Sequence, residues 1–236
     1  SVTYNNDADP PNITINPTSD LSQNTVYAIN YPPGAFTQTG TGGSFVGTAY
    51  TFKTILQVDT VWGWGYTSLG CLGLNESGYQ IAKSSPVQLT GTTWANIASS
   101  GGNKSYHMLG TKSDGTLWSW GYNAGDSSGA LGQNNRTNYS SPVQIPGTTW
   151  PTDPTTVKMT VSGTYNSSAI KTDGTLWMWG MGYVGGLGLN EGGNQIFKSS
   201  PCQLPGTTWN SITAARDGTG ATKTDGTLWT WGRNNY

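Results

Sequence analysis

Few side chains in this sequence have the chemistry of catalysis. His107 is the only histidine, so the sequence offers no histidine cluster for a metal ion, and a serine-based triad would have to be built around this one residue. Asp114, Asp173 and Asp225 are regularly spaced carboxylates that each precede a glycine, and turn formation explains Asp-Gly pairs better than paired-acid catalysis does. We therefore expect a protein that is not an enzyme and that holds no cofactor and no metal ion.

The remaining reactive side chains each allow two interpretations. His107 is either a general base or part of a repeated framework that hydrogen-bonds between strands, and we favour the framework. Glu76 and Glu191 occupy equivalent places in "LGLNESG" and "LGLNEGG", where they either help to bind a cation or a sugar or are solvated loop carboxylates, the commoner case. Cys71 and Cys202 lie at different places in the repeat, so spacing gives a disulfide no support, and Cys202 replaces a valine as a small buried hydrophobe.

The elements that must position these residues repeat along the chain. Three markers recur in a fixed order: Trp-x-Trp-Gly, Ser-Ser-Pro and Gly-Thr-Thr-Trp. The first marker occurs four times and the last three times, and together they contain all 11 tryptophans. The tryptophans of this repeat framework are Trp62, Trp64, Trp94, Trp118, Trp120, Trp150, Trp177, Trp179, Trp209, Trp229 and Trp231.

The spacing inside the repeat separates a constant half from a variable half. The second tryptophan of each pair lies at the same distance before the tryptophan of Gly-Thr-Thr-Trp in all three copies, from Trp64 to Trp94, from Trp120 to Trp150 and from Trp179 to Trp209. The distance from there to the next pair differs in every copy. We expect strands of constant length in the first half and loops that absorb insertions in the second.

Each repeat reads as several short strands. The Asp173-Gly174 pair in "AIKTDGTLWMWG" predicts a two-residue type I′ hairpin turn, with positive φ at both residues. After it, Trp177 and Trp179 are expected on one face of a strand because side chains alternate along a strand. Further strands are predicted at "SSPVQLTGTTW", "TVKMTVSG" and "NSITAA". Three or four strands in a unit of roughly 50 to 60 residues predict the blade of a β-propeller. Its turn framework comprises Asp114, Gly115, Asp173, Gly174, Asp225 and Gly226.

The run "GTLWxWGxNxxGxLGxNxxxxxSSPVQxPGTTW" resembles the repeat of the regulator of chromosome condensation family, whose members usually close seven such blades into a ring. The resemblance covers about Ala49 to Tyr236 and implies an all-β propeller, with three complete repeats and part of a fourth. His107 lies where that family's repeat often carries histidine, and the first repeat departs from the pattern at Thr60. We expect the native chain to continue beyond Tyr236 as part of a seven-bladed ring, or alternatively two copies to close one ring together.

The segment 1–48 differs in kind from the repeats. It carries Asp7, Asp9 and Asp20 and no basic residue, and we assign 1–48 to an attachment or lead-in segment and 49–236 to the propeller. An extended arm packed against the propeller is an equal alternative. Within the segment, "TVYAINYPPGAF" predicts one strand and a Pro-Gly turn, and "TQTGTGGS" predicts a linker.

Composition limits the compartment and the partners. Only 10% of residues are charged, the formal net charge is −1, and no lysine or arginine precedes Lys53, so the chain lacks the basic patch that nucleic acid requires. No apolar run reaches the roughly 20 residues of a membrane span. The Gly-, Thr-, Ser- and Asn-rich sequence is typical of β proteins outside cells or in virus particles. Six Asn-x-Ser/Thr sequences, weak indications in so polar a chain, lie at Asn12, Asn75, Asn103, Asn135, Asn138 and Asn166.

The resemblance implies several functions. The eukaryotic founder of the family exchanges nucleotides on a small GTPase, and bacterial relatives include secreted inhibitors of a β-lactamase. The sequences of these repeats also resemble repeats in structural proteins of marine bacteriophages. We favour a virion protein, a tail fibre, tail-associated or capsid-decorating component that contacts other virion proteins and a host glycan or protein. The alternative is a secreted bacterial binding or inhibitory module, and an enzyme ranks third.

Recognition is expected in the loops, because the framework is constant and the loops vary. The most divergent loops are Gly125–Tyr139 and Pro151–Met159, which lack groups suited to covalent chemistry. The first offers neutral hydrogen bonding together with an arginine and a tyrosine, which suits a glycan or a protein surface. Its candidate binding residues are Asn134, Asn135, Arg136 and Tyr139.

Overall fold

The structure is a computed structural model in which the chain forms two compact units, Ser1–Gln57 and Val58–Tyr236. No helix in its described part is long and apolar enough to cross a membrane. The described residues are 2–5, 12–15, 26–30, 49–53, 60–76, 78, 81–99, 106–125, 129–152, 158–161, 166–191, 196–215 and 218–234.

The first unit contains two antiparallel strand pairs. Strand β1 (Val2–Asn5) pairs with β2 (Asn12–Ile15), and β3 (Val26–Asn30) pairs with β4 (Ala49–Lys53). Strand β3 lies inside the predicted strand "TVYAIN", and the β3–β4 pairing places the start of the range 49–236 in this unit. The three aspartates, the Pro-Gly turn and the linker predicted for this segment lie outside the described residues.

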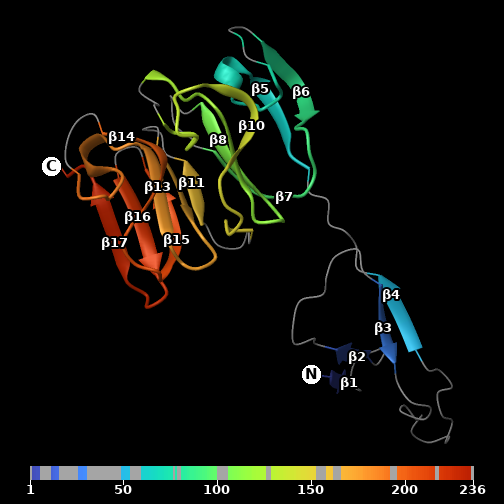
Figure 1. Ribbon diagram of the computed structural model, residues 1–236. Helices are drawn as coiled ribbons and strands as arrows, with labels where there is room; N and C mark the ends of the chain where they lie inside the picture. Colours follow the sequence, from blue (N-terminus) through green and yellow to red (C-terminus); the bar gives the residue numbers. More distant parts are fainter. Residues whose placement is uncertain are drawn as a thin grey trace, which may run out of the picture. The chain divides into compact units, whose positions relative to one another are not determined.

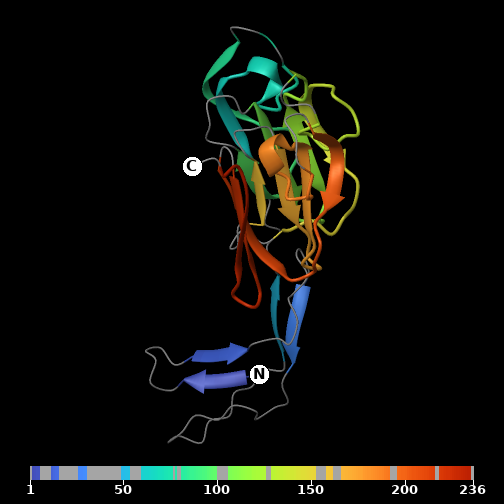
Figure 2. The same cartoon turned by 90° about the vertical axis from the view of Figure 1, so that its left-hand side faces the viewer.

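The second unit consists of four antiparallel sheets that follow one another along the chain, as Figures 1 and 2 show. The first sheet is β5 (Trp62–Tyr66) and β6 (Ala82–Gln88). The second is β7 (Trp94–Ser99), β8 (His107–Lys112), β9 (Leu117–Gly121) and β10 (Tyr139–Ile145). The third is β11 (Met159–Val161), β12 (Asn166–Ile170), β13 (Leu176–Met181) and β14 (Phe197–Gln203). The fourth is β15 (Trp209–Ala214), β16 (Gly218–Lys223) and β17 (Leu228–Gly232).

This arrangement confirms the predicted all-β blades, and in the described residues helix is limited to short 3-10 turns such as η1 (Ser68–Gly70) and η3 (Tyr183–Gly185). The sequence repeat and the sheet begin at different points along the chain. Trp94 and Trp209 begin the first strands of their sheets, so each interval of constant length leads from one sheet into the next. Strand β11 contacts β7 and β8, and β15 contacts β11 and β12. We call the contacts between consecutive sheets the first, second and third junctions.

The Asp-Gly hairpins have a three-residue loop, so the predicted type I′ turn is wrong. The amide of Gly115 donates to the carbonyl of Lys112 (2.9 Å), and the amide of Lys112 donates to the carbonyl of Thr116 (3.0 Å). Only the glycine has positive φ, at 79°, while Asp114 does not. The loop is therefore a type I turn followed by a left-handed glycine, which matches strand twist as a type I′ turn does.

The second tryptophan of each of the two middle pairs fills a junction, whereas Trp64 of the first pair is 62% exposed. Trp120 and Trp179 are 1% and 0% exposed. Their indole N–H groups donate to carbonyls of the preceding sheet's loops, Trp120 to Cys71 (3.1 Å) and Trp179 to Ala130 (2.9 Å). Each ring thus buries a large apolar surface and still satisfies its polar atom, and these rings form the centre of the core between sheets.

The first tryptophan of each of the two middle pairs, Trp118 and Trp177, lies on the same face as the second but is only half-buried. Trp177 and Trp179 both contact Trp150 edge-on, with centroid distances of 6.4 and 6.3 Å, which confirms the predicted shared face. Trp177 is half-buried, and its N–H donates within its own hairpin to Thr175. The two rings therefore differ in burial, although the alternation of side chains along the strand places both on the same face.

Candidate functional site

His107 belongs to the framework. Its ring is 1% exposed, and Nε2 lies 2.9 Å from the hydroxyl of Ser167 on β12, across the second junction. The Ser167 hydroxyl donates to the carbonyl of Ala130, so Nε2 carries the proton in this bond. Burial lowers the pKa of His107 to about 4, which keeps the imidazole neutral at pH 7. A buried donor that bridges two sheets fits the predicted framework role and not that of a general base.

The three hairpin aspartates also have structural partners. The carboxylate of Asp173 accepts hydrogen bonds from the amide (2.9 Å) and the hydroxyl (2.6 Å) of Thr175. The hydroxyl hydrogen bond from Thr175 holds the pKa of Asp173 below its usual value. The same hydroxyl accepts the indole N–H of Trp177 at 2.9 Å. Asp114 and Asp225 repeat this chain, so turn chemistry accounts for all three carboxylates.

The two cysteine thiols donate to backbone carbonyls, Cys71 to Tyr66 at 3.2 Å and Cys202 to Ser200 at 3.6 Å. Cys71 and Cys202 are free thiols, both half-buried, and burial raises the pKa of Cys71. Among the described residues no group of three histidine, cysteine or acidic side chains is placed to hold a metal ion.

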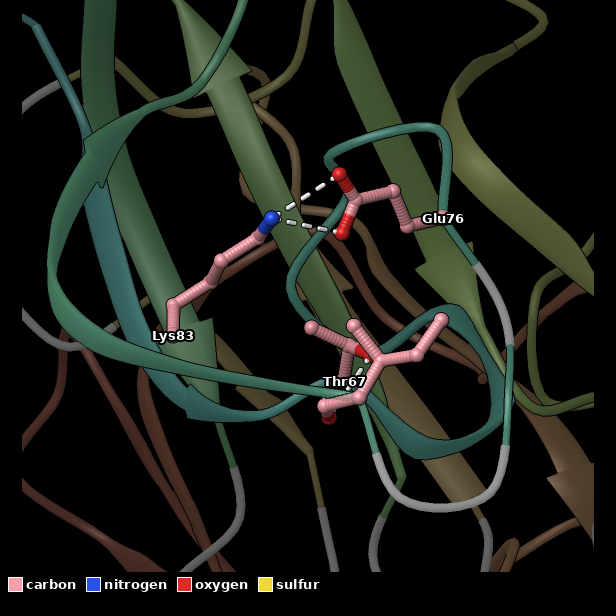
Figure 3. A network of polar contacts seen from close by, with 4 residues as sticks. Thr67, Glu76 and Lys83 are labelled. Atoms are coloured by element: carbon pink, nitrogen blue, oxygen red, sulfur yellow. Dashed lines mark hydrogen bonds and ion pairs between the residues drawn. The ribbon is translucent and has the colours of Figure 1, made fainter.

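Glu76 and Glu191 each form an ion pair in their loops. In Figure 3 the ammonium of Lys83 pairs with both carboxylate oxygens of Glu76, at 2.8 and 2.9 Å. The backbone amide and the hydroxyl of Thr67 both donate to the carbonyl of Ile81. Lys198 pairs with one carboxylate oxygen of Glu191 at 2.9 Å. These loops therefore close on themselves, with lysine as the partner of each carboxylate.

The equivalent loop at the second junction has a neutral contact in place of this ion pair. Asn135 stands where its neighbours have glutamate, and Tyr139 precedes Ser-Ser-Pro where they have lysine. The amide of Asn135 donates to the hydroxyl of Tyr139 at 3.0 Å. Two of the predicted binding residues are thus the pair that makes this loop unlike the other two.

The remaining two predicted residues extend from this loop to the third sheet. The backbone N–H of Asn134 donates to the carbonyl of Ser199 (2.7 Å), and the hydroxyl of Ser200 donates to the side-chain oxygen of Asn134 (3.3 Å). Asn75 makes the same contacts at the first junction, so Asn134 is part of the repeated framework. Arg136 is exposed, and its guanidinium lies 5.2 Å from the ring centroid of Phe197. The four residues share one loop, and their binding role stays a prediction.

A groove of about 360 Å³ adjoins this loop at the second junction. Its lining includes Trp150, Trp177 and Lys171, which we call the floor, and Gln133, Gln144 and Ser200, which we call the walls. The ammonium of Lys171 lies 4.8 Å from the ring centroid of Trp150 and 4.5 Å from that of Trp177, a cation–π arrangement. Lys112 and Lys223 occupy the same place at the other junctions.

Sequence reasoning missed this groove. Two features of the sequence could have indicated it. A lysine lies three positions before the glycine of every Asp-Gly turn, at a constant distance from the following tryptophan pair, and Gln133 replaces the leucine of the other repeats. The second predicted recognition loop, Pro151–Met159, is described only at its ends, and residues 153–157 lie outside the described part.

The comparisons with known proteins agree on the fold. The chain is 25% identical over 176 residues to the ultraviolet-B receptor UVR8 of Arabidopsis thaliana, covering 75% of this chain and 38% of the receptor. Among solved structures, Prp20p of Saccharomyces cerevisiae, studied for its binding to Gsp1p and histones, superposes with a TM-score of 0.56 at 22% identity, covering 75% of this chain and 42% of Prp20p. Human WBSCR16 gives 0.54 at 21% identity, with 72% and 42% covered.

These similarities show that the second unit has the regulator-of-chromosome-condensation-like β-propeller repeat fold. The chain spans less than half the length of each of these relatives. No family model matches the chain.

Proposed function

We propose that this chain is a non-enzymatic structural protein of a bacteriophage virion, a tail fibre, tail-associated or capsid-decorating component that displays its propeller sheets to a host or partner surface. The observation that carries the recognition part is the loop of Asn134, Asn135, Arg136 and Tyr139. It keeps the framework contact of Asn134 but replaces the internal ion pair by a neutral hydrogen bond and adds an exposed arginine.

Two further observations support a recognition role without catalysis. The one histidine is buried and neutral at pH 7, and the hairpin carboxylates are held in turns. Prp20p, a protein of the same fold, is described by its binding to Gsp1p and histones, and propellers in general serve as platforms on which loops vary.

The structure sharpens the mutational test. Asn134 must be kept, because it joins the second sheet to the third. The test variant is Asn135→Glu with Arg136→Ser and Tyr139→Lys, which gives this loop the ion-pair residues of its neighbours. A matched control makes the converse change at the first junction, Glu76→Asn with Lys83→Tyr.

We expect particles carrying the test variant to assemble normally and to adsorb to the host at least tenfold more weakly, while the control adsorbs normally. Normal adsorption of assembled particles that carry the test variant would contradict display, and failed assembly of those particles would indicate a purely structural joint.

A secreted bacterial binding or inhibitory module is the alternative, favoured by the protein-binding neighbour of the same fold. Copurification distinguishes the two proposals. Fixed stoichiometry with a capsid or tail supports the virion protein, whereas a free protein bound to a single soluble partner supports the secreted module.

A further inference from the structure

We infer that the groove at the second junction binds a saccharide that carries a carboxylate, such as a uronic acid. The inference deepens the proposed recognition function and rests on it, because it names the ligand that the displayed sheets would recognise. The groove's volume of about 360 Å³ lies near the lower end for small-molecule sites, about 300 to 1,000 Å³, and suits one or two sugar rings better than an extended peptide.

The floor of the groove offers a positive charge with spare hydrogen-bond capacity. Lys171 forms no ion pair with any carboxylate of the described residues. Asp173, whose pKa it helps to lower, is held by Thr175 instead. The ammonium rests on the rings of Trp150 and Trp177, which fix its place without using its N–H donors. A ligand carboxylate would accept a charge-assisted hydrogen bond there.

The walls offer the amides, and the floor offers the ring, that a sugar needs. Gln133 uses its amino group on Ser119 and on the carbonyl of Val143, both at 3.1 Å, which leaves its oxygen as an acceptor. Gln144 is exposed and makes no side-chain hydrogen bond within the described part of the chain. The half-buried ring of Trp177 supplies an apolar surface beside these polar groups.

The second junction differs from the other two in residues that favour the binding of an anion. Leu74 and Leu189 stand where Gln133 stands, so the other two junctions lack this amide. Their loops carry Glu76 and Glu191, whereas this loop carries Asn135 and a nearby arginine. The lysine and tryptophans of the floor recur at every junction, so selectivity for this groove would come from its wall.

The test is calorimetric titration of the purified full chain with three probes. They are an oligosaccharide of alternating glucuronate and N-acetylglucosamine, the same oligosaccharide with its carboxyl groups reduced to alcohols, and a glutamate-rich peptide. The key variants are Lys171→Met and Gln133→Leu. Lys112→Met is the matched control, because it removes the same ammonium from the same pair of rings at the first junction.

We expect the acidic oligosaccharide to bind, with affinity at least tenfold weaker for Lys171→Met, weaker for Gln133→Leu and unchanged for Lys112→Met. Equal binding of the reduced oligosaccharide, tighter binding of the peptide, equal losses for the two lysine variants, or no binding at millimolar concentration would each overturn the inference. The proposed display function is tested separately. If no saccharide binds but particles with the loop variant still adsorb weakly, the groove site is refuted and the display function is supported. If the saccharide binds through Lys171 but particles with the loop variant adsorb normally, the groove site is supported and the display function is refuted.

Discussion

The stability of this protein should depend on pH through a single buried imidazole. His107 is the only histidine in the chain, so its titration is not overlaid by that of another. It is 1% exposed, Nε2 donates to Ser167, and Nδ1 has no hydrogen-bond partner among the described residues. Protonation would add a charge and a second donor in a place that satisfies neither.

The magnitude follows from the two pKa values. The pKa of His107 falls from 6.5 to about 4 on folding, so the unfolded state binds more protons between these values and stability falls as the pH falls through this window. The full contribution, present above pH 6.5, is about 3 kcal/mol, since a pKa difference of one corresponds to 1.36 kcal/mol. By pH 5 about 2 kcal/mol of it should be lost.

The measurement is urea unfolding followed by tryptophan fluorescence at pH 7, 6 and 5, for the wild type and for His107→Asn. Asparagine is a suitable replacement because Asn166 occupies the equivalent place on the next sheet, paired with a strand glycine in the same register. Titration of the carboxylates is common to both proteins and cancels in the comparison.

We expect the unfolding free energy of the wild type to fall by about 2 kcal/mol from pH 7 to pH 5, and that of the variant to stay nearly constant. Parallel pH profiles for the two proteins would refute the burial and neutrality of His107. An increase in wild-type stability at pH 5 would show instead that the charged imidazole has a partner in the folded state.

Three further predictions concern the framework. Trp179→Ala should lower the unfolding free energy by about 3 to 5 kcal/mol and Trp177→Ala by less, because only Trp179 is fully buried; equal losses in urea titrations would contradict the difference in depth. Gly174→Ala should lower the unfolding free energy by about 1 to 3 kcal/mol more than Gly226→Ala does. Both glycines have positive φ, but only at Gly174 would a Cβ lie 2.2 Å from the carbonyl oxygen of Thr207. A thermal unfolding experiment in which Gly226→Ala is the less stable variant would refute this prediction. Circular dichroism should show little helix, and a helical fraction above about one fifth would be incompatible with the sheets described.

The sequence alone determined the repeated elements. Strand positions, the shared face of Trp177 and Trp179, and the hairpins at Asp-Gly pairs follow from patterns a few residues long, because local backbone preferences and side-chain alternation act over that range. The framework role of His107 was also accessible, because its place in the repeat is matched by Asn166. The turn type was missed because a two-residue and a three-residue loop share the same Asp-Gly sequence.

Only the tertiary structure decided what happens between sheets. Alternation assigns Trp177 and Trp179 to one face, but the neighbouring sheet determines that one ring is buried and the other half-buried. Lys171 and Gln133 lie far apart in the chain and line one groove because the second and third sheets pack together. Contacts across a junction join residues from different repeats, so no local pattern specifies them.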